Sequence, residues 1–132
     1  MEDLIIFIND LATDLFYEKT FLLGKDLFQR GACYELFLII NSLEKDTTLY
    51  IHKSHNHVAI KHNNKLYDST GEIENKEEYR PVTKDDMIYI DEYFGESYRH
   101  LNIKDKMLKE LDKINIKEVI KRMNKAKEKV LS

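Results

Sequence analysis

The sequence has a single cysteine, no long hydrophobic run and no marked excess of charge of either sign. Only Cys33 carries a thiol, so an internal disulfide is excluded and nothing indicates an oxidising compartment. No apolar stretch approaches the roughly 18 residues that a membrane-spanning helix needs, and the start Met1-Glu2-Asp3 is acidic where a secretory signal would be basic. These absences predict a cytoplasmic protein with no membrane partner.

Acidic and basic residues are mixed along the chain, and the formal net charge is -3. Binding to a phosphate backbone requires a basic face, so nucleic acid is not an expected partner. The chain also lacks internal repeats and low-complexity linkers, and its length of 132 residues suits one core rather than two. We therefore predict a single domain over residues 1–132. Frequent Lys, Ile, Asn and Glu favour a low-GC bacterium or its phage as the source.

Helices are predicted at both ends of the chain and before its middle. Apolar residues recur at spacings of three and four from Leu4 to Phe16, which indicates an amphipathic helix. Residues 20–29 show no sustained period. A nearly all-apolar helix should then run from Cys33 to about Leu43 and be buried in the centre. The tail Lys104–Leu131 predicts two helices that close the core, with Met123 and Val130 among its apolar positions.

The middle of the chain predicts a small antiparallel sheet. The segments 47–51, 57–60 and 66–68 are β-prone, and Asn63-Asn64 between the last two favours a two-residue hairpin turn. A fourth strand is expected at Met87–Ile90, although Thr83 followed by Asp86 also suits a helix cap. The polar tract Ser69–Arg80 is expected to form a surface loop. The fold class is therefore α+β.

Three residues in this arrangement have the chemistry of a cysteine nucleophile with its base and orienting group. Cys33 supplies a thiol, His57 an imidazole and Asp68 a carboxylate. With a two-residue turn, His62 faces Lys65 and Ala59 faces Asp68, so His57 lies diagonal to Asp68 on the same face of the hairpin. A shift of one residue in register would move the carboxylate to the opposite face.

Cys33 is also placed where a thiolate is favoured. The first turn of a helix presents the positive end of the helix dipole, and a neighbouring imidazolium adds to that effect. The Cys33 amide is a first-turn donor that can contribute to an oxyanion hole. Gln29 and Asn56 are the candidates for a second oxyanion donor.

These motifs resemble a known superfamily. A Gly-x-Cys that opens an apolar helix, a His-Val at the start of a strand and a Tyr-Asp-Ser-x-Gly at the end of the next strand are similar to the papain-like cysteine peptidases, in particular small bacterial and phage members of the NlpC/P60 and transglutaminase-like type. The resemblance covers Phe28–Gly71. It implies a central helix with an N-terminal cysteine packed on a small antiparallel sheet, with Cys33 as nucleophile, His57 as general base and acid, and Asp68 as the orienting residue.

Other roles exist for the same residues. A lone cysteine that opens a buried helix is most often a small core residue. The local histidine cluster suggests Zn²⁺, but His57 and His62 lie on opposite faces of one strand and there is no second thiolate, so we predict no metal and no cofactor. The following aromatic residues either line a cleft near Cys33 or fill half-buried positions, which is the commoner role of tyrosine: Tyr79, Tyr89, Tyr93, Phe94 and Tyr98.

The sequence thus predicts a hydrolase or acyl transferase with a Cys-His-Asp triad that acts on an amide or ester, with peptidase, amidase and deamidase all open. The expected substrate or partner is a protein or peptide. The competing hypothesis is a papain-like binding module without turnover, such as a phage- or mobile-element-encoded inhibitor or adaptor of a host protein. The oligomeric state is left open.

Overall fold

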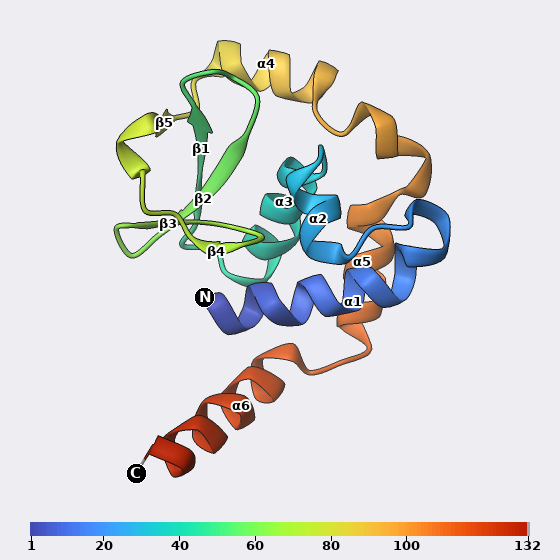
Figure 1. Cartoon of the computed structure of the whole chain (residues 1–132), viewed down its shortest axis with the longest axis vertical. Coiled ribbons are helices and arrows are strands. Elements are labelled where there is room, and N and C mark those ends of the chain that lie inside the picture. The colour runs from blue at the N-terminus through green and yellow to red at the C-terminus, as the bar shows by residue number, and fades with distance from the viewer. Residues whose placement is uncertain (132) are drawn as a thin grey trace.

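Helices precede and follow a small antiparallel sheet in this chain (Figure 1). The computed structural model describes residues 1–131, without the side chains of Met123 and of positions 127–131. The predicted α+β class is confirmed. The elements are α1 (Glu2–Thr20), α2 (Gly24–Gln29), α3 (Cys33–Leu43), β1 (Thr48–His52), β2 (Val58–His62), β3 (Lys65–Asp68), β4 (Gly71–Glu72), η1 (Lys76–Glu78), β5 (Tyr79–Pro81), α4 (Lys84–Tyr93), η2 (Glu96–Leu101), α5 (Ile103–Asp112) and α6 (Ile116–Leu131).

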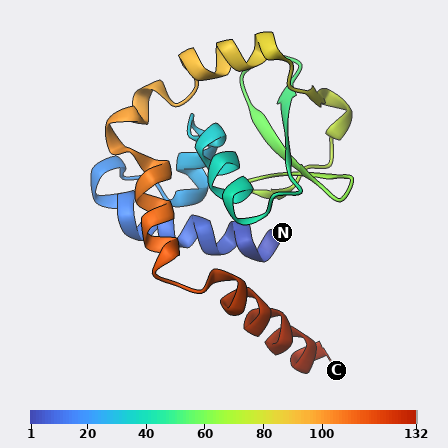
Figure 2. The same ribbon diagram turned by 180° about the vertical axis from the view of Figure 1, so that it is seen from behind.

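The long helices form where the apolar periodicity predicts them. α1, α3 and the two C-terminal helices agree with the sequence, whereas residues 24–29 form the short helix α2 in a stretch without a sustained period. α6 points away from the body of the molecule in both views (Figure 2). The predicted apolar positions Met123 and Val130 lie outside the described side chains. None of the helices described over residues 1–131 combines the length and apolarity of a membrane-spanning segment.

The β2–β3 hairpin has the register that the sequence predicts. Asn63 and Asn64 form its two-residue turn with φ of 51° and 63°, the left-handed conformation that asparagine tolerates. His62 pairs with Lys65, and Ile60 pairs with Tyr67. The sheet continues on both sides in the order β4-β3-β2-β1-β5, with antiparallel pairing throughout.

Two predictions for residues 69–90 are wrong. The expected strand at Met87–Ile90 is part of helix α4, because Thr83 and Asp86 form a complete capping box at its start. Its buried side carries Met87, Ile90 and Phe94, which are three and four residues apart as a helix requires. The expected loop 69–80 contains β4, η1 and the beginning of β5. β5 is an edge strand beside β1, the position in a sheet that tolerates Pro81.

The main core lies between the helices and one face of the sheet. α3 packs on β2, α2 and α5. The buried side chains of this core come from α1, α2, α3, η2, α5, the start of α6 and the β2–β3 hairpin, among them Ile8, Phe16, Phe28, Leu36, Ile40, Ile60 and Met107. A smaller cluster beneath α4 joins Cys33 to Ile51, Val58 and Ile90. The start of α3 is therefore held between the sheet and α4, which fixes the position of Cys33.

Candidate functional site

Cys33 is the first residue of α3, and the chain reaches it through a turn. Gly31 has φ of 136°, a conformation that side-chain-bearing residues rarely adopt, and it directs the chain from α2 into α3. The Ala32 carbonyl accepts the first helical bond, from the Leu36 amide. The amide of Cys33 has no acceptor within its own helix, because the first amides of a helix never do. The Cys33 side chain is 5% exposed.

His57 and Asp68 meet as the hairpin register predicts. Nε2 of His57 lies 3.1 Å from Oδ2 of Asp68, and both side chains are mostly buried. A side-chain hydrogen bond also links His57 to Cys33 and helps to raise the His57 pKa. Because Nε2 bonds Asp68, Nδ1 is the ring nitrogen that remains for the sulfur. The structure therefore brings together the three residues that the sequence singles out.

Hydrogen bonds from its own loop orient the Asp68 carboxylate. Oδ1 accepts from the amide of Thr70 at 2.8 Å and from the Thr70 hydroxyl at 2.5 Å. Oδ2 remains for His57. Because both oxygens have donors, the carboxylate is held with Oδ2 directed at His57.

The helices in turn hold the loop that follows Asp68. Asn9 of α1 donates to the Ser69 carbonyl at 2.9 Å. The Ser69 hydroxyl donates to the carbonyl of Lys25 at 2.7 Å and accepts from Nε2 of Gln29 at 2.9 Å. Sequence reasoning did not find Asn9 or Ser69, because these contacts join residues 40 or more positions apart.

The charges of His57 and Asp68 stabilise each other. Burial disfavours the imidazolium, but the hydrogen bonds and negative charges of Asp68 and Cys33 outweigh it and raise the pKa of His57 to about 9. Burial likewise opposes ionisation of Asp68, yet hydrogen bonds from His57, Thr70 and Gln29 lower its pKa to about 2. At neutral pH the site therefore holds an imidazolium beside a carboxylate. Burial and the charges of Asp68 and Cys33 raise the pKa of Tyr79, whose ring packs edge-on to His57, to about 12.

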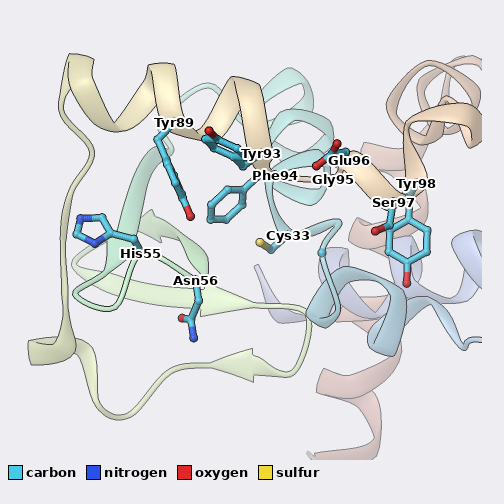
Figure 3. A pocket seen from close by; sticks show the side chains of 11 residues that line it. Cys33, His55, Asn56, Tyr89, Tyr93, Phe94, Gly95, Glu96, Ser97 and Tyr98 are labelled. Carbon is cyan, nitrogen blue, oxygen red and sulfur yellow. The ribbon is translucent and has the colours of Figure 1, made fainter.

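A pocket of about 250 Å³ opens beside Cys33 (Figure 3). Its walls come from α4, η2 and the β1–β2 loop, and the predicted aromatic residues Tyr89, Tyr93, Phe94 and Tyr98 line it. Tyr79 does not line it and instead contacts His57. The pocket gives a small molecule or a side chain access to the sulfur.

The two oxyanion candidates have different surroundings. The amide nitrogen of Gln29 is used by Ser69, so this side chain supports the Asp68 loop. Asn56 lines the pocket together with Cys33. Its Oδ1 accepts from the Ser54 hydroxyl at 2.6 Å, which leaves its Nδ2 as a donor. Of the two candidates, Asn56 is the one that lines the pocket.

The remaining histidines have separate surroundings. His52 bonds Ser54, and His62 lies near the Asp46 carbonyl. His55 contacts Arg80, which forms a two-pronged ion pair with the buried Asp86. Within residues 1–131, no three His, Cys, Asp or Glu side chains are grouped as metal ligands would be.

Comparison with known families assigns the chain to a family. A family model described as Phage YunG-like protein matches residues 8–121. The chain belongs to the Phage YunG-like family. The part of this Phage YunG-like protein that matches includes Cys33, His57, Asp68 and every residue of the pocket, and it ends within α6. The phage part of the predicted source agrees with this family. Comparisons with curated proteins and with solved structures gave no significant match.

Proposed function

We propose that this protein is a cysteine-dependent hydrolase or acyl transferase with a papain-like arrangement of Cys33, His57 and Asp68. One observation carries the proposal: a thiol at the first turn of a helix lies beside an imidazole whose other nitrogen is bonded to an oriented, buried carboxylate. This is the relation of nucleophile, base and orienting group that acyl transfer requires. The pocket beside the sulfur supplies the access.

In the proposed reaction, the Cys33 thiolate attacks the carbonyl carbon of an amide or ester. The amide of Cys33 and Nδ2 of Asn56 donate to the oxygen that becomes negative. The imidazolium of His57 gives its proton to the leaving amine or alcohol, and a thioester remains on Cys33. His57 then takes a proton from water or from an acceptor amine, which attacks the thioester and restores the thiolate. Asp68 keeps its hydrogen bond to Nε2 through both steps.

The second candidate is a binding module of the same fold without turnover, directed at a host protein by a phage. Two observations favour it. The Cys33 side chain is almost fully buried, whereas Tyr89 and Tyr93 at the pocket are 42% and 53% exposed. Exposed tyrosines are typical of protein-binding surfaces.

The rate of Cys33 alkylation by iodoacetamide at about pH 7 and at about pH 9.5 separates the two candidates, because only the thiolate reacts. In the proposed enzyme the rate at pH 7 stays close to that at pH 9.5. His57→Ala removes the imidazolium, and the rate at pH 7 should fall by about tenfold or more relative to that at pH 9.5. His100→Ala, which removes an exposed histidine elsewhere, is the matched control.

The same pH ratio in wild type and His57→Ala would contradict the hydrolase proposal and favour the binding module. A Cys33 thiol that does not react at either pH in the folded wild type would also contradict the hydrolase proposal. If instead the thiol reacts at pH 7 and His57→Ala slows it, the next step is a screen of peptide, amide and ester substrates for turnover that Cys33→Ala abolishes.

A further inference from the structure

The pocket beside Cys33 has an aromatic wall that is open to solvent. The rings of Tyr89 and Tyr93 are 4.9 Å apart at an angle of 44°, and Phe94 lies edge-on to Tyr89 at 6.0 Å. Figure 3 shows Tyr89 and Phe94 projecting from α4 and the segment after it, toward the side of the pocket where Cys33 lies. Aromatic faces carry negative charge density, so exposed faces of this kind attract cations as well as apolar groups.

The charges around the pocket favour a cation. None of the residues that line it is Lys or Arg, and Glu96 supplies a carboxylate. The one histidine in the lining, His55, packs edge-on against Tyr89. The backbone of Gly95, which lines the pocket, lies so close to the side chain of Glu35 that a Cβ atom at this glycine would collide with Oε1. Oε2 of Glu35 is buried and has no hydrogen-bond partner.

The guanidinium groups nearby are already engaged. Arg80 is paired with Asp86. Arg99 donates to the carbonyls of Asp91 and Glu92 and lines a neighbouring cavity. Neither side chain lines the pocket, so neither supplies a cation to the aromatic wall from within the chain.

We infer that the pocket binds a lysine or arginine side chain of the substrate, next to the carbonyl that Cys33 attacks. This inference rests on the proposed function for the role of the thiol, and on the pocket itself for the choice of side chain. A volume of about 250 Å³ suits one long side chain and is smaller than typical ligand sites. An acidic side chain would be repelled by Glu96, whereas the charge of a lysine or arginine side chain would be attracted to it.

Binding can be measured apart from catalysis in the Cys33→Ala protein. The probes are N-acetyl-arginine amide, N-acetyl-norleucine amide and N-acetyl-glutamate amide, titrated while the tyrosine ring signals are followed by NMR. The arginine probe should shift the Tyr89 and Tyr93 signals and bind about two- to fivefold more tightly than the norleucine probe, which is the range expected for an exposed cation–π contact. The glutamate probe should bind most weakly.

Variants of the aromatic wall test which side chains cause the preference. Tyr89→Leu in the Cys33→Ala background should remove most of the arginine preference, and Tyr89→Phe should keep it because the ring remains. Glu96→Gln should weaken binding of the arginine probe and leave the norleucine probe unchanged. Tyr17→Leu, at an exposed tyrosine of α1, is the matched control. Far-UV circular dichroism checks that each variant is folded.

Equal binding of arginine and norleucine probes would overturn the inference, as would the absence of binding or a preference for glutamate. These results are independent of the alkylation experiment. A clear arginine preference together with an unactivated Cys33 would keep the cation pocket and reject the hydrolase. An activated thiol without the preference would reject only the choice of side chain.

Discussion

The proton on His57 makes the stability of this protein depend on pH in a defined window. Its pKa is about 9 in the folded chain and 6.5 in an unperturbed histidine. Between these values the native state holds a proton that the unfolded chain has lost, so the free energy of unfolding must fall as pH rises. The stabilisation is fully present below pH 6.5 and is lost as the pH passes 9.

The expected size of the effect follows from the same two values. Integrating the linkage relation from pH 6.5 to pH 8 gives a loss of about 1.5 kcal/mol in the free energy of unfolding from His57 alone. The comparison is made with Cys33→Ala in every protein, including the one called wild type here, because a Cys33 thiolate that gains a proton on unfolding would oppose this loss within the same window. The His57 side chain is 15% exposed, so solvent screens its contact with Asp68 only slightly.

Urea denaturation followed by far-UV circular dichroism at several pH values would measure this loss, since the chain has no tryptophan to report unfolding by fluorescence. The contribution of His57 is the difference in pH slope between wild type and His57→Ala. His100→Ala should keep the wild-type slope. If wild type and His57→Ala lose stability equally between pH 6.5 and 8, the ion pair of His57 with Asp68 is not present in solution.

Three further predictions concern stability. Asp86→Ala removes part of the capping box of α4 and the partner of Arg80. It should lower the free energy of unfolding, measured by urea denaturation, by about 2 kcal/mol. Asp85→Ala, at an exposed neighbour, should have little effect. Asn64→Val should lower it by about 1 to 2 kcal/mol because a β-branched residue resists φ of 63°, whereas Asn64→Gly should not. The pKa of Asp68 is lowered to about 2, so its contribution is present above pH 3.8 and lost as pH falls through 2; acid titration should show a smaller loss in Asp68→Asn than in wild type.

The sequence predicted the parts of the site that depend on local rules. The start of α3 at Cys33 follows from Gly31 and the apolar run behind it, and the structure begins the helix at that residue. The His57–Asp68 pairing follows from the two-residue turn, because the turn sets the register and strand alternation then places both side chains on the same face. A short-range sequence pattern is sufficient to predict a feature whose geometry is set by neighbouring residues in the chain.

Sequence reasoning failed where local preferences conflict. Residues 87–90 include isoleucine and tyrosine and favour a strand, but the capping box at Thr83 and the helical spacing of the buried side chains decide for a helix. β5 is too short to be recognised alone, and its pairing with β1 forms across a long connection. The role of Gln29 was also not foreseen, since its partner Ser69 is 40 residues away.

The sequence alone determined the α+β class, the start of the central helix and the register that puts a histidine beside an aspartate. These features depend on capping, turn conformation and alternation, which act over a few residues. Only the tertiary structure decided that α4 and η2 cover the first turn of α3 and form, beside the sulfur, an aromatic pocket without lysine or arginine. The reason is physical: the aromatic side chains of the pocket are more than 50 residues from Cys33 in the sequence, and only packing of the whole core brings them to it.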